Sequence, residues 1–340
     1  MITLHILSNP SNPVSLYNRI DPFSILAYKF ITYMSSYGWK CIHYGVVGSE
    51  VLCENVLCLP EITDSAEKNT AIYNKNAAIE IAKRKSPGDM IVCFYGWQNR
   101  EAAEQHSDLT IVEPSTGYDT SAIFAPYRIF PSYGHMHMFY GSKNMLMNPS
   151  WFDAVIPNGI DSREFEFTTD KEDYFLTFGR VIESKGIHVA IQATKELNKK
   201  LIIAGTGNLK DLGYTEIPSH VEVVGPCNVD QRNKLMRNAK ALIAPTYYIE
   251  PVGNMVVEGL MSGTPSITTD WGGFVDTVVH GKTGFRCREF KEFLSAIDSI
   301  DNIDPANCRN FAVSNFDDPV IHSKINDYFI KLKYKNFYRQ

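Results

Sequence analysis

Strand-like apolar segments alternate with helical segments along the chain, and this alternation constrains the fold more than any other feature. In the first half, two segments carry apolar residues at helical spacing: residues 23–37, which end at Gly38, and residues 71–85, which end before Pro87 and Gly88. The strands expected around them are residues 3–7, 41–47, 56–59, 90–95 and 109–112. Such an order of strands and helices predicts a parallel β-sheet.

The second half repeats this pattern, with helices expected over residues 186–197 and 229–238. The expected strands are residues 174–178, 200–204, 221–224, 241–244 and 266–268. In open α/β sheets, ligands bind outside the carboxyl ends of the strands. Four of these ends carry glycine, polar or charged residues: Gly179-Arg180, Gly205-Thr206-Gly207, Gly225-Pro226 and Thr246-Tyr247. We therefore expect an α/β protein with a ligand-binding edge on its second sheet.

Composition excludes several classes of protein. The 340 residues are 44% hydrophobic and long enough for two domains. A net charge of -5 argues against a nucleic-acid-binding protein, which would show a basic surplus. The seven cysteines are scattered without a CxxC pair, which favours reduced thiols and a cytoplasmic protein. No apolar run is long enough to span a membrane, and residues 1–7 are expected to form a first strand rather than a signal peptide.

A small-residue turn between two carboxylates is the strongest functional signal. Glu250 and Glu258 lie eight residues apart, with Gly253 between them. If a helix begins at Asn254 and Met255, its unpaired backbone N–H groups and the positive end of its dipole form a seat for phosphate. Glu258 would then lie about one turn further along the helix and Glu250 on the preceding loop, so that two hydrogen-bond acceptors flank the phosphate.

A second motif supplies positive charge. Arg180 and Lys185 lie five residues apart beside Gly179 and Gly186, after an expected strand. Arginine offers a planar fork and lysine a point charge, which suits a diphosphate whose negative charge grows during bond cleavage. A sugar nucleotide fits both motifs.

Taken together, these motifs resemble the retaining glycosyltransferases of family 4, which have the GT-B fold. The resemblance covers residues 150–290 well and is weak upstream. It rests on Gly179-Arg180 with Lys185-Gly186, on Glu250 and Glu258 with Gly253, on Gly263-Thr264-Pro265, and on residues 156–161 and 280–285. It implies two Rossmann-like domains that face each other across a cleft. It also implies a role in glycan biosynthesis, with transfer of a sugar from a nucleoside diphosphate sugar to a hydroxyl group of a glycan, lipid or small molecule.

The resemblance also implies roles for single residues. Arg180 and Lys185 would stabilise the leaving diphosphate, Glu258 would bind the ribose hydroxyls, and Glu250 would hold hydroxyls of the transferred sugar. The residues expected to bind the donor are Gly179, Gly205, Gly225, Pro226, Gly253, Asn254, Met255, Val256 and Glu258. Gly205-Thr206-Gly207 either touches the nucleotide through its backbone or is a tight turn. No cofactor is expected, and UDP or GDP is the favoured nucleotide of the donor, with adenosine open.

The acceptor side carries a weaker signal. Glu113 stands where many relatives have a histidine, and it either accepts the proton of the acceptor or pairs with Arg128. The aromatic residues after the strand at 90–94 are either a platform for a sugar ring or part of the core. The acceptor-side candidates are Ser8, Asn9, Tyr95, Gly96, Trp97, Gly117 and Tyr118.

No metal site is expected. The chain lacks a DxD motif at a suitable place, and Asp317-Asp318 is expected to be a solvated loop. His135 and His137 lie in an alternating, aromatic-rich segment that offers no third ligand, so structural histidines are favoured over cleft lining. Alternatives to transfer are a catalytically silent module that binds sugar nucleotides, or another GT-B enzyme such as a sugar-nucleotide epimerase.

The expected domains are an N-terminal acceptor-binding domain of residues 1–163 and a C-terminal donor-binding domain of residues 164–317. A final helix, residues 318–340, would return to the first domain and pack through Phe329, Leu332 and Phe337. Its basic and aromatic end either touches an anionic membrane or is a solvated helix end, which we favour.

Overall fold

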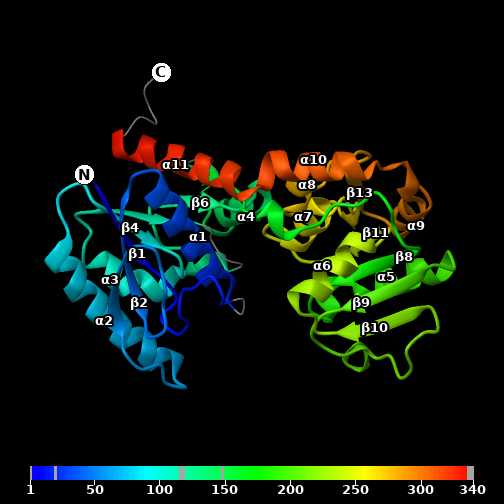
Figure 1. Ribbon diagram of the computed structural model, residues 1–340, viewed down its shortest axis with the longest axis horizontal. Helices are drawn as coiled ribbons and strands as arrows, with labels where there is room; N and C mark the ends of the chain where they lie inside the picture. The colour runs from blue at the N-terminus through cyan, green and yellow to red at the C-terminus, as the bar shows by residue number, and fades with distance from the viewer. Residues whose placement is uncertain (1, 19–20, 115–118, 146, 148, 335–340) are drawn as a thin grey trace. The chain divides into compact units, whose positions relative to one another are not determined.

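The computed structural model describes residues 2–18, 21–114, 119–145, 147 and 149–334. These residues form two compact units, each with its own parallel sheet (Figure 1). The first unit runs to Pro131 and includes residues 136–157 and the chain from Ile321 onward, whereas the second contains residues 132–135 and 158–320. The predicted α/β class with a parallel sheet in each half is confirmed.

The described part of the first unit contains a seven-stranded sheet in the order β3-β2-β1-β4-β5-β6-β7, in which all pairs are parallel. Its strands are β1 (Thr3–Leu7), β2 (Lys40–Val46), β3 (Glu54–Leu59), β4 (Met90–Cys93), β5 (Thr110–Glu113), β6 (Tyr127–Phe130) and β7 (Ala154–Val155). Its helices are α1 (Pro22–Ser36), α2 (Ala66–Arg84), α3 (Arg100–Glu104), most of α4 (Tyr133–Ser142) and most of α11 (Asp318–Tyr334). The last two strands were not predicted.

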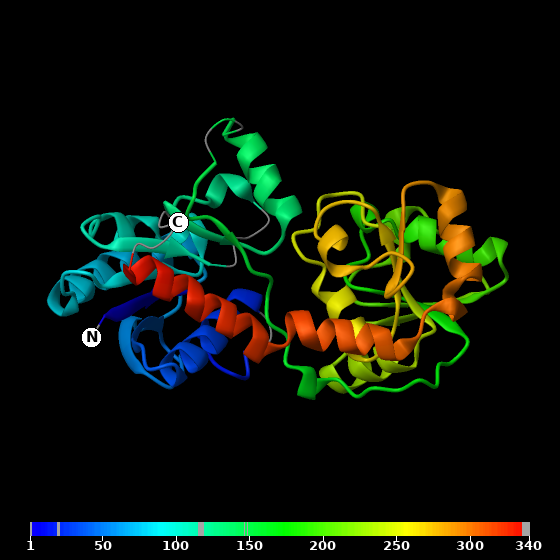
Figure 2. The same cartoon turned by 90° about the horizontal axis from the view of Figure 1, so that it is seen from above.

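Helix α11 packs beside α1, although the two lie at opposite ends of the chain (Figure 2). The ring centres of Phe30 on α1 and Phe329 on α11 are 5.4 Å apart. Phe329 and Leu332 are buried, as expected of packing residues, whereas Phe337 lies outside the described residues. Burial of aromatic and aliphatic side chains is the main force that holds such a terminal helix in place.

In the second unit, the described strands form a six-stranded parallel sheet in the order β10-β9-β8-β11-β12-β13. They are β8 (Tyr174–Phe178), β9 (Lys200–Ala204), β10 (Val221–Gly225), β11 (Ala241–Ala244), β12 (Ser266–Thr269) and β13 (Gly284–Cys287). The helices are α5 (Ile187–Glu196), α6 (Val229–Asn238), α7 (Asn254–Met261), α8 (Phe274–Thr277), α9 (Phe290–Asp298) and α10 (Pro305–Phe316). The strand order reverses beside β8, so the carboxyl ends of β8 and β11 flank a switch point where α/β proteins bind ligands.

One local expectation was wrong. Asp317-Asp318 is not a solvated loop: Asp317 ends α10, its Oδ1 accepts a hydrogen bond from Ser162 N over 2.9 Å, and Asp318 is 3% exposed at the start of α11. His135 and His137 lie on helix α4, and His135 is buried, which agrees with a structural histidine. Among the described residues, no helix is long and apolar enough to cross a membrane.

Candidate functional site

Three glycines line up at the carboxyl ends of neighbouring strands in the second unit. Gly179 follows β8, Gly205 follows β9, and Gly225 ends β10. Gly179 N donates to Ala204 O over 2.9 Å, and Gly205 N donates to Gly225 O over 2.7 Å. All three have positive φ angles, so the chain turns sharply away from the sheet without side chains in the way. Backbone is therefore exposed where a ligand is expected.

Gly205 shows the tightest packing of the three, and it yields a testable prediction. A Cβ atom on Gly205 would lie 1.8 Å from Gly179 O, at a φ of +136°. We expect Gly205→Ala to lower the free energy of unfolding by at least about 2 kcal/mol more than Gly213→Ala, because overpacking adds to backbone strain. Gly213 has a φ of +86°, and a Cβ atom there would meet nothing within 4 Å, so it reports strain alone. Urea unfolding of both variants measures the difference; equal losses would contradict the close contact.

Helix α7 begins at Asn254, as predicted. Gly253 precedes it with φ 80° and ψ 54°, a left-handed conformation that glycine adopts without penalty. In the part of the chain that the structure describes, the amides of Asn254 and Met255 have no backbone acceptor, whereas Val256 N donates to Gly253 O over 2.8 Å. Both predicted amides are therefore available to a phosphate, whereas the amide of Val256 is used inside the helix.

Lys185 and Glu250 form an ion pair beside this helix. Lys185 Nζ donates to Glu250 Oε2 over 2.6 Å, and their side chains are 17% and 6% exposed. The same ammonium lies 4.9 Å from the centre of the Tyr248 ring, a cation–π distance. The structure thus joins two predicted site residues that are 65 positions apart.

The turn that carries Lys185 is attached to the neighbouring strand. Tyr247 N, after β11, donates to Ser184 O over 2.9 Å. A Cβ atom on Gly186 would lie 2.0 Å from Pro245 O, so only glycine allows this close approach. The ammonium of Lys185 is consequently placed by backbone contacts as well as by its ion pair.

Arg180 differs from Lys185 in its surroundings. Its side chain is exposed, and none of the residues that the structure describes forms an ion pair with it. The backbone on both sides is held, because Gly179 N donates to Ala204 O and Val181 N donates to Thr206 O over 2.7 Å. A guanidinium on a fixed backbone at a strand end is available to an anionic ligand.

Glu258 lies on α7, one turn after its start, as predicted. Arg232 Nη1 on α6 is 3.5 Å from Glu258 Oε2, and both side chains are 19% exposed. The pair keeps the Glu258 carboxylate close to a cation while leaving part of it in solvent. No sequence motif indicated Arg232, because it lies on α6, which is separated from α7 by strand β11 in the chain.

The loop that carries Glu250 is supported by the segment from Trp271 to Gly273. Gly273 N donates to Glu250 O over 2.7 Å, and Trp271 Nε1 donates to Tyr248 O over 3.2 Å. A Cβ atom on Gly272 would lie 2.8 Å from Glu250 N. These glycines therefore position Glu250 through the backbone. Tyr248 was not predicted as a site residue, although it directly follows Tyr247 at the end of a predicted strand.

In the first unit, Glu113 ends β5 and is 3% exposed. Its Oε2 accepts hydrogen bonds from Phe124 N over 3.1 Å and Ala125 N over 3.2 Å. The alternative of a pair with Arg128 is not observed, because Arg128 Nε donates to Asp153 Oδ1 over 2.8 Å. Burial raises the pKa of Glu113 to about 7, more than the two backbone donors lower it.

This raised pKa predicts a pH dependence of stability. Between pH 4.5 and about 7, the folded protein keeps a proton on Glu113 that the unfolded chain has released, so the stability of the native protein falls as pH rises through this range. We expect Glu113→Gln to be more stable than the native protein by about 2–3 kcal/mol at pH 8.5 and to show no gain near pH 4.5. Urea unfolding across this pH range measures the gain. A gain that does not depend on pH would contradict the assignment.

The other acceptor-side candidates have different surroundings. Ser8 and Asn9 are each 1% exposed: Ser8 Oγ is 2.9 Å from His43 Nε2, and Asn9 Nδ2 donates to Asp21 Oδ2 over 2.8 Å. They hold the loop after β1 in place. Trp97 is 58% exposed, so it is not a core residue, whereas Tyr95 is partly buried and contacts the Phe23 ring edge to face.

Three further candidates complete the set. Gly96 approaches Glu113, since a Cβ atom there would lie 3.6 Å from Glu113 Oε1. Gly117 and Tyr118 lie outside the described residues.

Within residues that the structure does describe, no group of three histidine, cysteine or acidic side chains is arranged to hold a metal ion.

Comparisons with known proteins relate the second unit to one family model and the chain to several solved structures. Residues 160–310 match the family model of glycosyl transferases group 1. Glycogen synthase from Mycobacterium tuberculosis is 31% identical over 163 residues, which are 43% of this chain and 39% of that protein. The chain thus spans about two fifths of the length of these curated relatives. The matched residues lie in the second unit, which carries the glycine turns, Lys185 and α7.

Solved structures resemble the chain over nearly all of its length. Sucrose-phosphate synthase from Thermosynechococcus elongatus has a TM-score of 0.71 at 16% identity, covering 98% of this chain and 99% of that one. HepE from Anabaena, solved in complex with UDP-glucose, has a TM-score of 0.71 at 15% identity and covers 97% of this chain and 100% of its own. The two Rossmann-like units therefore have the GT-B fold, as the resemblance implied.

Proposed function

We propose that this protein is a retaining glycosyltransferase of family 4, which transfers a sugar from a nucleoside diphosphate sugar to a hydroxyl group. The observation that carries the proposal is the convergence of Lys185, Glu250 and the first amides of α7 at the carboxyl ends of β8 and β11. The match to glycosyl transferases group 1 covers the same residues, and a structural neighbour, HepE, was solved with UDP-glucose. UDP is the first nucleotide to test.

The proposed chemistry uses this set of groups to stabilise the leaving group. When the anomeric C–O bond breaks, the bonding electron pair leaves with the diphosphate, and its negative charge increases. The amides of Asn254 and Met255, the ammonium of Lys185 and the guanidinium of Arg180 are donors for that charge. Glu258 would accept hydrogen bonds from the ribose, and Glu250 from hydroxyls of the sugar.

Donor binding has to rearrange one contact that the structure records. Lys185 is already bonded to Glu250, so its ammonium must be shared with, or transferred to, the diphosphate. An ammonium has three N–H donors, which allows it to keep one on Glu250 while another turns to phosphate. Glu250 would in that way remain oriented toward the sugar.

Glu113 is proposed as the group that takes the proton of the acceptor hydroxyl. A carboxylate with a pKa near 7 is a stronger base than an exposed one and is still ionised in part at neutral pH. The acceptor is proposed to be a hydroxyl of a glycan, a lipid or a small molecule.

We expect donor turnover without added metal, because Arg180, Lys185 and the α7 amides already supply positive charge. The test incubates the protein with UDP-, GDP- and ADP-sugars and a panel of hydroxyl acceptors, and measures release of the nucleoside diphosphate with and without EDTA. One donor should be consumed at equal rates in both conditions. Complete loss of release in EDTA would contradict metal independence, and binding without release across the panel would favour a silent sugar-nucleotide-binding module.

A further inference from the structure

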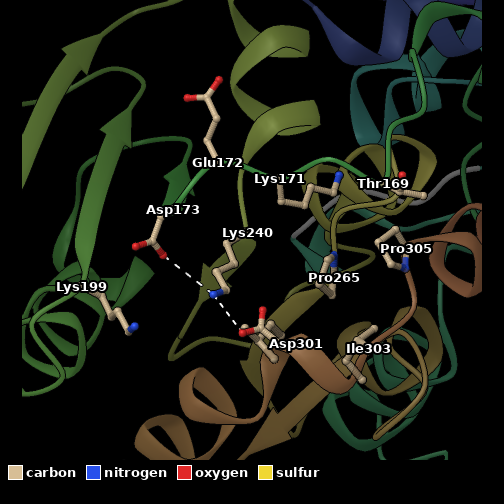
Figure 3. A pocket seen from close by; sticks show the side chains of 11 residues that line it. Thr169, Lys171, Glu172, Asp173, Lys199, Lys240, Pro265, Asp301, Ile303 and Pro305 are labelled. Atoms are coloured by element: carbon tan, nitrogen blue, oxygen red, sulfur yellow. Dashed lines mark ion pairs between the residues drawn. The ribbon is translucent and has the colours of Figure 1, made fainter.

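A pocket of the second unit opens at the amino ends of the strands, the edge opposite to the glycine turns. It has a volume of about 490 Å³ (Figure 3). Lys199 precedes β9, Lys240 precedes β11, and Pro265 precedes β12, so the pocket follows the edge of the sheet. The other wall comes from the turn at Asp301 and from Ile303, before α10. The volume falls in the range of pockets for small molecules, about 300–1,000 Å³.

Two lysines and two aspartates face one another across this pocket. Lys240 Nζ is 3.0 Å from Asp301 Oδ2 and 3.8 Å from Asp173 Oδ1 (Figure 3). Lys199 also lines the pocket, on the side of Asp173 (Figure 3). Within the described chain, Lys199 has no ion-pair partner. Each aspartate keeps its second carboxylate oxygen available, because Lys240 contacts only one oxygen of each. The four side chains sum to zero charge.

The two remaining charged groups of the lining are already used. Lys171 Nζ donates to Arg237 O, Ser262 O and Thr264 Oγ1, at 2.7, 3.2 and 2.9 Å, which accounts for all three of its N–H groups. Glu172 accepts a hydrogen bond from Asn238 Nδ2 over 2.7 Å, and its carboxylate points away from Lys199 and Lys240 (Figure 3). A ligand would therefore meet Lys199, Lys240 and the two aspartates.

The rest of the lining consists of Thr169 and of aliphatic residues. Pro265, Ile303 and Pro305 lie near one another on the Asp301 side of the pocket (Figure 3). The part of the lining that the structure describes contains no aromatic side chain, whereas sugar rings and nucleobases are commonly held against aromatic faces. Because these four side chains sum to zero charge, a ligand with net charge would lack one counter-charge within the pocket. The pocket thus favours a small, net-neutral molecule with both charges and an aliphatic part.

We propose that this pocket binds a free α-amino acid with an aliphatic side chain. The carboxylate of the ligand pairs with Lys199, its ammonium group pairs with the available oxygen of Asp301 or Asp173, and its side chain packs against Ile303 and the two prolines. This site is separate from the proposed donor site and does not depend on it.

Leucine is the probe, and ligand-observed NMR titration of the full chain measures its dissociation constant. We expect a dissociation constant on the order of 1 mM, because leucine has only about nine non-hydrogen atoms with which to contact the pocket. The probe has three matched controls: 4-methylpentanoate lacks the ammonium group, isopentylamine lacks the carboxylate, and D-glucose replaces the zwitterion by a sugar. Each ionic analogue should bind at least about fivefold more weakly than leucine, since each loses one charge pair.

Amino-acid substitutions test whether leucine binds in this pocket. Lys199→Gln should weaken leucine at least about fivefold without loss of stability, because Lys199 pairs with none of the described residues. Lys195→Gln, an exposed lysine of α5 outside the pocket, and Arg180→Ala, at the proposed donor site, should leave leucine affinity unchanged. The proposal is overturned if leucine does not bind saturably, if D-glucose binds more tightly, or if Lys199→Gln binds leucine as the native protein does.

Discussion

Arg180→Ala should lower kcat for donor turnover by about a hundred- to a thousandfold, the loss expected when one preorganised donor to a developing charge is removed. The side chain is exposed at the end of β8 and has no ion-pair partner among the described residues, so its removal leaves no buried charge behind. Folding should therefore be preserved, and the loss should appear in the rate rather than in the stability. Release of the nucleoside diphosphate at saturating donor measures kcat.

Two matched variants separate this effect from a general loss of positive charge. Arg180→Lys keeps the charge but loses the planar fork, so its kcat should lie between those of the native protein and Arg180→Ala. Lys195→Ala removes another exposed cation, from α5, and should leave kcat within about twofold, as is usual for surface substitutions. A native kcat in Arg180→Ala, with an unchanged thermal midpoint, would remove Arg180 from the mechanism.

The elements that position the proposed donor site could be predicted because their signals are local. Strand β8 and helix α6 have the predicted boundaries, and α7 begins at the predicted residue. Each is a short apolar or amphipathic segment next to glycine, proline or a capping residue, and such signals lie within a few neighbouring positions. The phosphate seat follows from the same local pattern, since it consists of Gly253 and the first turn of the helix.

Contacts between segments that are distant in the chain could not be predicted from local sequence patterns. The sequence places Lys185 and Glu250 in separate motifs, and nothing in either motif indicates that they bond to each other. Arg232 beside Glu258 and the glycines behind Glu250 depend on how helices and loops pack in three dimensions. In the first unit, Glu113 on β5 lies opposite Arg128 on β6, yet the guanidinium of Arg128 donates its hydrogen bond to Asp153. Side-chain direction decides such pairs, and strand order alone does not.

The Lys185–Glu250 pair should have a large effect on stability. Lys185→Ala removes this ammonium from the Glu250 carboxylate, which is 6% exposed, and it also removes the cation–π contact with Tyr248. Breaking a buried ion pair from one side costs about 3–5 kcal/mol, and we expect a loss of about 3 kcal/mol here because Lys185 is 17% exposed. Urea unfolding at neutral pH measures this loss through tryptophan and tyrosine fluorescence.

The double variant Lys185→Met with Glu250→Gln distinguishes an uncompensated charge from lost packing. Neutral side chains of similar length keep most of the volume and leave no charge behind, so most of the lost stability should return. A double-mutant cycle should then give a coupling energy of about 2 kcal/mol between the two positions. Additive losses would show that the two side chains do not stabilise each other in solution. They would also imply that Lys185 is already free to meet a diphosphate, with no exchange of partners on donor binding.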